Sequence, residues 1–209
     1  MVLVVPNLRP GYKLMTPLYQ VSDSPAVVSK KYFSRRELMP SQNSSVWQIQ
    51  SGSVRTMTYL DDGTIVTLGI WGAGDIVGSA LSTIEPHIIE CLSAVEAVAL
   101  PLDRQNKMVE ALAAHVEQAE ELMVIRSYRT VDSMLLKLLG WLAKRFGRTV
   151  DNGQLIDLRL TNQDVAEILC STRVTVSRVL TQFEDQGMIQ RLPLHRIVLC
   201  NQETLRRAS

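Results

Sequence analysis

Two arginines, Arg173 and Arg178, lie five positions apart in a segment whose other residues are mostly small or β-branched. A guanidinium carries several N–H donors in a fixed planar arrangement, so it binds phosphate oxygens and can form two hydrogen bonds with the acceptor edge of guanine. Reading or binding a nucleic acid is therefore the chemistry that this pair could perform. It requires one element that presents both side chains on the same surface.

The segment that holds them, STRVTVSRVL (171–180), resembles a β-strand in composition but follows a helical period better. At 100° per residue, both arginines and Ser177 fall on a mostly polar face, and the opposite face is mostly apolar. The sequence therefore predicts an amphipathic helix over about residues 172–186, ended by Gly187. Its β-branched residues have low helix propensity, so packing of the apolar face must stabilise it.

The other residue types that perform chemistry are scattered. The sequence has no CxxC motif, histidine cluster, nucleophile–base pair or catalytic pair of carboxylates, so we expect no metal site, no cofactor, no disulfide framework and no enzymatic activity. The cysteines are Cys91, Cys170 and Cys200, and the histidines are His87, His115 and His195.

The chain of 209 residues is long enough for one large domain or two small ones, and its hydrophobic content of 46% supports real cores. It has no apolar run that would span a bilayer and no signal-peptide pattern, so we expect a cytoplasmic protein without membrane contact. Net charge is +1, but residues 1–143 carry 12 basic and 14 acidic side chains, whereas residues 144–209 carry 10 basic and 7 acidic ones. That asymmetry is compatible with nucleic-acid contact there.

The N-terminal half is predicted to be β-rich. Residues 1–25 are rich in proline and predict a loosely packed arm. Residues 26–102 contain short alternating runs separated by turns, and Asp62-Gly63 is typical of a hairpin turn because glycine accepts positive φ. Short antiparallel strands at this spacing predict a barrel or a roll.

Residues 103–147 predict a long helix that can break near residues 128–131. An apolar stripe follows its helical period and has two interpretations, a seam between two copies of the chain or a face packed on the chain's own core. The stripe consists of Leu112, Val116, Ala119 and Met123.

Residues 148–209 predict a small C-terminal unit. After a polar connection over residues 147–157, Thr161 is a good N-cap for a helix that ends near Leu169. A tight turn then leads into the helix of the two arginines, and a hairpin-like wing follows. Helix, tight turn, helix and wing form a winged helix-turn-helix.

At this point the sequence resembles the Crp/Fnr superfamily of bacterial transcription regulators over residues 26–200. A WxIxxGxVR…DG…GD.VG pattern is similar to the family's cyclic-nucleotide-binding-like β-roll, and the long helix is similar to its dimerisation helix. The matching residues are Trp47, Ile49, Gly52, Val54, Arg55, Asp62, Gly63, Gly74, Asp75, Val77 and Gly78.

The resemblance implies an α+β fold with an N-terminal antiparallel β-roll, a long dimerisation helix and a C-terminal winged helix-turn-helix. It implies a homodimeric activator that binds double-stranded DNA and contacts RNA polymerase. The recognition helix is most similar to that of the cyanobacterial nitrogen-control regulators, which implies a palindromic GTA…TAC-like operator. The catabolite-activator helix has a glutamate where this chain has Val174, and valine offers a thymine methyl an apolar contact instead.

The candidate DNA contacts come from both helices of the motif. Hydroxyls and helix N-termini suit phosphate oxygens, whereas the two arginines suit guanine edges or phosphates. Arg191, His195 and Arg196 of the wing are weaker phosphate candidates. The predicted contacts are Thr161, Gln163, Ser171, Thr172, Arg173, Val174, Ser177 and Arg178.

Two departures from the family pattern concern the effector and the turn. Ser79 stands where members that bind cyclic AMP have glutamate, and residues 80–101 contain no arginine or lysine, so cyclic AMP binding is not expected. An unidentified small-molecule or protein effector stays open. Cys170 stands in the turn where the family usually has glycine, at a cost of about 1 kcal/mol if its φ is positive.

A second class of function also stays open. The winged helix could contact protein instead of DNA, which would make the chain a ligand- or protein-binding adaptor. The exposed positions predicted for the two arginines favour DNA.

Overall fold

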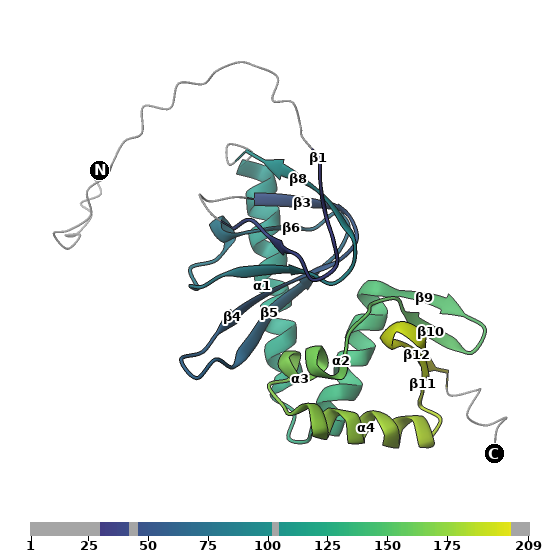
Figure 1. Ribbon diagram of the computed structural model, residues 1–209. Coiled ribbons are helices and arrows are strands. Elements are labelled where there is room, and N and C mark those ends of the chain that lie inside the picture. The colour runs from purple at the N-terminus through teal and green to yellow at the C-terminus, as the bar shows by residue number, and fades with distance from the viewer. Residues whose placement is uncertain (1–29, 42–45, 102–104, 202–209) are drawn as a thin grey trace, which may run out of the picture.

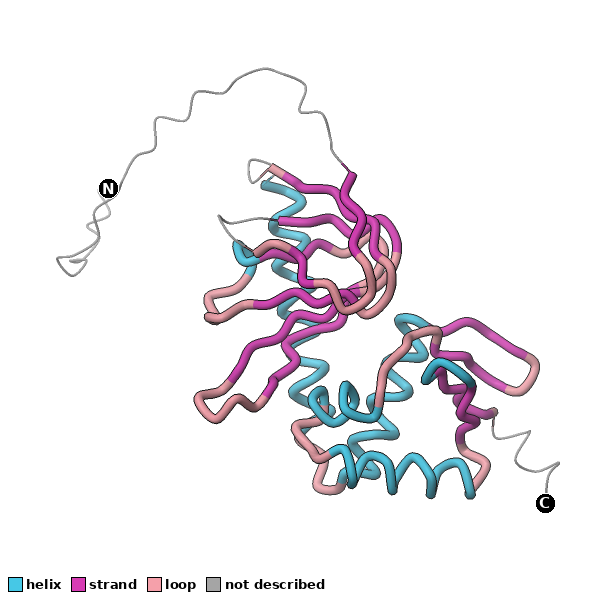
Figure 2. Tube along the Cα trace, viewed as in Figure 1, coloured by secondary structure: helices cyan, strands magenta, loops and turns pink. Residues whose placement is uncertain are grey.

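The computed structural model describes residues 30–41, 46–101 and 105–201 (Figures 1 and 2). A β-rich N-terminal part lies against a long helix, which continues into a smaller C-terminal unit of helices and short strands. The predicted N-terminal arm, residues 1–25, lies outside the described residues. Within the described ranges, no helix combines the length and the apolar character needed to cross a membrane.

The N-terminal part is an antiparallel roll of two four-stranded sheets, with strand orders β1-β8-β3-β6 and β2-β7-β4-β5. Bulky side chains, among them Trp47, Ile49 and Trp71, are buried between the sheets. The predicted turn at Asp62-Gly63 joins β4 and β5, and Gly63 has φ 80°. The strands are β1 (Lys30–Phe33), β2 (Leu38–Met39), β3 (Val46–Ser51), β4 (Val54–Tyr59), β5 (Ile65–Trp71), β6 (Ile76–Gly78), β7 (Ile88–Cys91) and β8 (Val95–Leu100), with a short 3-10 helix at Ser79–Leu81.

The long helical region is broken where the sequence indicated, into α1 (Gln105–Arg126) and α2 (Val131–Phe146). Thr130 caps α2, because its side chain accepts a hydrogen bond from the N–H of Ser133 at 3.3 Å. One face of α1 packs on the roll. Gln118, which is fully buried, accepts from the N–H of Ile70 and donates to its carbonyl, at 2.5 and 3.0 Å.

The opposite face of α1 is exposed. Val116 and Met123 of the predicted apolar stripe have 58% and 69% of their surface accessible, and Leu112 has 46%. The interpretation that this stripe packs on the chain's own core is therefore wrong. A row of exposed apolar side chains at this spacing is typical of a helix that pairs with another helix.

The C-terminal unit is a winged helix-turn-helix, as predicted. Its four-stranded sheet has the order β11-β12-β10-β9. The elements are β9 (Gly147–Val150), β10 (Gly153–Ile156), α3 (Asn162–Ile168), α4 (Arg173–Asp185), β11 (Ile189–Leu192), a 3-10 turn at Pro193–His195 and β12 (Arg196–Cys200).

One sequence-based expectation in this unit is wrong. The sequence predicts a polar connection over residues 147–157, but β9 and β10 pair there as an antiparallel hairpin. Leu155 and Ile156 have about 3% of their surface exposed, and Ile156 joins the apolar core shared with α2, α3 and α4. The fold class is confirmed by these elements, with Ala166 and Val176 buried where α3 and α4 meet.

Candidate nucleic-acid interface

The polar face of α4 is open to solvent over its first turns. Arg173 and Arg178 are exposed, and neither has a hydrogen-bond or ion-pair partner among the residues that the structure describes. Val174, between them on this face, is 79% exposed. The predicted amphipathic arrangement is confirmed, because the opposite face is buried at Val176, Val179, Leu180 and Phe183.

Local signals explain why a segment rich in β-branched residues becomes this helix. Thr172 is the N-cap, and its hydroxyl accepts a hydrogen bond from the N–H of Thr175 at 3.2 Å. Gly187, with φ 70°, follows the C-terminal end. The buried face then offsets the low helix propensity of the valines.

The turn between α3 and α4 sets the angle between the two helices. Cys170 adopts φ 51°, so the cysteine occupies a left-handed conformation that costs about 1 kcal/mol without glycine. The N–H of the next residue, Ser171, donates to the carbonyl of Ala166 at 2.9 Å and closes the turn. The Cys170 side chain is exposed.

The N-terminal end of α3 holds two more of the predicted contacts. Thr161 and Asp164 form a capping box, in which the hydroxyl of Thr161 accepts from the N–H of Asp164 at 3.1 Å and the carboxylate of Asp164 accepts from the N–H of Thr161 at 2.8 Å. Gln163 is exposed and donates a hydrogen bond to Glu167 at 2.9 Å. Both predicted residues therefore have defined positions beside α4.

Two adjoining hollows bring most of the predicted contacts together. A cleft of about 730 Å³ between α3, α4 and the wing is lined by Thr161, Gln163 and Arg173. A groove of about 700 Å³ along α4 is lined by Arg173, Val174, Ser177 and Arg178. Ser171 and Thr172 lie outside both hollows, at the turn before α4.

The three wing candidates differ in the hydrogen-bond and ion-pair partners of their side chains. Arg191 binds Glu184 of α4, with its backbone N–H at 3.1 Å and its Nε at 2.7 Å from the carboxylate, and these bonds lower the pKa of Glu184. Arg191 therefore ties β11 to α4. Arg196 lies 3.9 Å from Asp157, whereas His195 at the tip is exposed.

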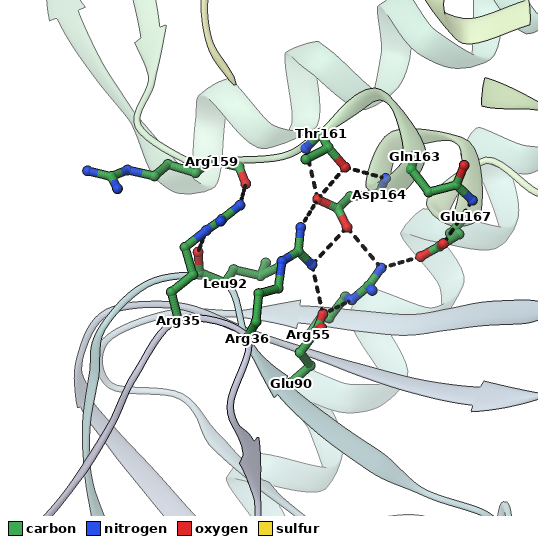
Figure 3. A network of polar contacts seen from close by, with 10 residues as sticks. All are labelled: Arg35, Arg36, Arg55, Glu90, Leu92, Arg159, Thr161, Gln163, Asp164 and Glu167. Atoms are coloured by element: carbon green, nitrogen blue, oxygen red, sulfur yellow. Dashed lines mark hydrogen bonds and ion pairs between the residues drawn. The ribbon is translucent and has the colours of Figure 1, made fainter. Parts of the chain in front are cut away.

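A cluster of charged side chains behind α3 was not identified from the sequence. Arg36 and Arg55 of the roll bind Asp164 and Glu167 of α3, and both arginines also bind Glu90 of the roll (Figure 3). The one available signal was Arg55, a charged residue inside the otherwise uncharged strand VRTMTY. Its hydrogen-bond partners lie 35 and 112 positions away, so no local pattern could name them.

Comparison with known proteins identifies the family. The Crp-like helix-turn-helix domain matches residues 133–208. The regulatory protein CysR of Synechococcus elongatus is 38% identical over 186 residues, with 88% of each chain covered. The global nitrogen regulator of Synechocystis sp. is 25% identical, over 93% of this chain and 92% of that protein.

Solved structures share the fold. A CRP-family transcriptional regulator from Thermus thermophilus superimposes with a TM-score of 0.71 at 20% identity, covering 85% of this chain and 95% of that one. FixK2 from Bradyrhizobium japonicum gives a TM-score of 0.71 at 20% identity, covering 87% and 96%. The shared fold, the matching domain and the identity to CysR along most of both chains lead to one conclusion: this chain belongs to the Crp/Fnr family and is a DNA-binding transcription regulator.

Proposed function

We propose that this regulator is a homodimeric activator that binds a palindromic GTA…TAC-like operator and does not depend on cyclic AMP. The observation that carries the proposal is the exposed face of α4, where Arg173 and Arg178 have no partner among the described residues and flank an exposed Val174. Basic side chains that have no partner within the protein and project from a helix are suited to bind the phosphates and base edges of DNA. RNA polymerase is the further partner that we propose for an activator.

Each predicted contact has a role in this proposal. The two arginines bind guanine edges or phosphates, and Val174 contacts a thymine methyl. Thr161, Ser171 and Thr172 at the starts of the two helices offer hydroxyls and N–H groups to phosphates. The exposed Gln163 on α3 and the half-buried Ser177 on α4 complete the set of proposed contacts.

The dimer is proposed through the exposed apolar stripe of α1. Two copies joined along this stripe would present two α4 helices, and a palindromic site requires them to be one DNA turn apart, roughly 34 Å. Without the second copy the stripe would leave several large apolar side chains in water, an arrangement that is typical of an interaction surface.

Titration of the whole chain against labelled DNA tests the proposal. The probes are a GTA…TAC palindrome, the same duplex with scrambled half-sites, and random duplex, each at a stated salt concentration. Tight binding of the palindrome by a dimer, roughly 1,000-fold or more over random duplex, is typical of a specific regulator. No preference for the palindrome over the other two would contradict the proposal, and the adaptor function would then be favoured.

Val174→Glu is expected to change sequence preference. A carboxylate at this exposed position can accept a hydrogen bond from the N4 amine of cytosine, which valine cannot do. The variant should therefore select GTGA-like half-sites from a randomised operator library. Val174→Thr, which keeps the shape without the charge, is the control. An unchanged consensus for Val174→Glu would show that this position does not read bases.

Calorimetry with cyclic AMP, cyclic GMP and 2-oxoglutarate is expected to give no binding at micromolar concentrations. An anion that enters a site between the roll and α1 must find a cation there to replace its hydration. Arg126, the arginine of α1, already donates to the carbonyls of Ile168 and Thr67 at 2.7 and 2.5 Å. His115 stacks on Trp71 with ring centroids 3.9 Å apart, which fills part of this interface. Micromolar binding of any of the three compounds would overturn the prediction and identify a signal.

A further inference from the structure

Five charged side chains join the β-roll to the first helix of the helix-turn-helix (Figure 3). Arg36 follows β1, Arg55 lies on β4 and Glu90 lies on β7, whereas Asp164 and Glu167 lie on α3. Arg55 and Asp164 are nearly buried, with side-chain exposures of 5% and 3%. Charges this far from water are stable only while they are paired and hydrogen-bonded.

The charged side chains form two series of hydrogen bonds, here called arms. The first arm runs from Arg36 through Asp164 to Thr161. Arg36 holds Asp164 with two parallel hydrogen bonds, Nη1 to Oδ1 at 2.9 Å and Nη2 to Oδ2 at 2.6 Å. Oδ2 also accepts from the N–H and the hydroxyl of Thr161, at 2.8 and 2.9 Å. Burial alone would raise the pKa of Asp164, but the bonds from Arg36 and Thr161 hold that pKa below its usual value. The carboxylate therefore stays ionised and keeps both partners.

The second arm ends at Gln163. Arg55 donates from Nη1 to Oε2 of Glu167 at 2.5 Å. The other oxygen of Glu167, Oε1, accepts from the side-chain amide of Gln163 at 2.9 Å. Without that bond, the exposed Gln163 side chain would sample several rotamers, and ordering it would oppose any contact that it makes.

Glu90 connects the two arms. Its Oε2 accepts from Nη1 of Arg36 at 3.0 Å and from Nε of Arg55 at 2.7 Å. Glu90 of the roll therefore holds both arginines in the positions from which they bind the carboxylates of α3. Nη1 of Arg55 also lies 3.5 Å from Oδ1 of Asp164. Two cations among three carboxylates leave the cluster with excess negative charge. Loss of Arg55 therefore leaves Glu167 without a cation, and loss of Arg36 leaves three carboxylates to one arginine.

We propose that Arg36 and Arg55 are positioning residues for DNA binding, through which the β-roll sets the conformation of Thr161 and Gln163. Each arginine binds a carboxylate of α3, and that carboxylate binds one of the two α3 residues that face the DNA in the proposed function. The roll therefore acts on DNA affinity without touching DNA. A shift of the roll that withdraws either arginine would release the corresponding contact. This inference rests on the proposed function.

A double-mutant cycle on operator affinity tests the second arm with the whole chain and the GTA…TAC duplex. Arg55→Gln and Gln163→Ala should each weaken binding, roughly three- to thirtyfold. The double variant should be no weaker than the weaker single variant, because Arg55 acts through Gln163. A junction that only contributes to folding would not produce this coupling, and additive losses would overturn the inference for Arg55.

The same cycle with Arg36→Gln and Thr161→Ala tests the first arm, and it decides the inference if Arg55→Gln does not fold. Arg36 is about one-third exposed, so its replacement is better tolerated than that of Arg55. Lys30→Gln is the matched control, because it removes one positive charge and one ion pair, with Glu96 of β8, from the roll and not from α3. Its affinity should equal that of the unaltered protein.

The proposed function and this inference fail in different ways. An unaltered protein that does not prefer the operator overturns both together. Specific binding by the unaltered protein, combined with additive cycles in both arms, overturns the inference alone. Thermal unfolding of every variant ensures that affinities are compared between folded proteins.

Discussion

Arg173→Ala and Arg178→Ala should each weaken binding to the specific operator by roughly 1–3 kcal/mol per half-site, if the side chain forms a bidentate contact with a base. A dimer carries the substitution twice, so the total loss could reach about 6 kcal/mol on a palindrome. Both side chains are exposed and have no partner among the described residues. Their removal should therefore leave the fold and its unfolding temperature unchanged.

Fluorescence anisotropy on operator and random duplex separates base reading from phosphate binding. A base contact is lost only on the operator, whereas a phosphate contact is lost on both duplexes and lowers the salt dependence by about one charge per half-site. Arg148→Ala is a matched control, because Arg148 is an exposed arginine of the β9–β10 hairpin. Equal losses on operator and random DNA would contradict a base contact by Arg173 or Arg178.

Val116→Glu is expected to convert the proposed dimer into a monomer. Val116 lies in the middle of the exposed stripe of α1 and is 58% exposed in the single chain. A two-fold interface contains the residue twice, once from each copy, so the variant would place two like charges in an apolar seam. Dimer affinity should fall by at least about 2 kcal/mol, or roughly thirtyfold.

Light scattering at micromolar concentration, with and without operator DNA, measures the result. Operator binding should fall together with dimerisation, because a monomer engages one half-site only. Tyr32→Glu is the control, since it introduces the same charge at an exposed aromatic residue of β1 in the roll. A Val116→Glu protein that remains dimeric, or an unaltered protein that is monomeric on operator DNA, would count against the proposed interface.

The helices of the C-terminal unit could be predicted from the sequence because their signals are local. The period of apolar residues, the N-caps Thr161 and Thr172, and Gly187 after the last turn all act within a few positions, so they predict both α3 and α4. The same local signals predict the break between α1 and α2 and the Asp62-Gly63 turn. The resemblance of spaced motifs to a family then predicted the roll and its order along the chain.

The contacts between the roll and α3 were decided only by the tertiary structure. Arg36 and Asp164 are 128 positions apart, and nothing around either residue indicates the other. The tertiary structure also decided the burial of Leu155 and Ile156, which lie in a β-hairpin where the sequence predicted a polar connection. The sequence alone determined the recognition helix and the face that carries its arginines, because helix period and capping depend on neighbouring residues. Which side chains bind α3 was decided by the packing of the roll against the C-terminal unit, because two charges that are distant in sequence pair only when the tertiary structure brings them together.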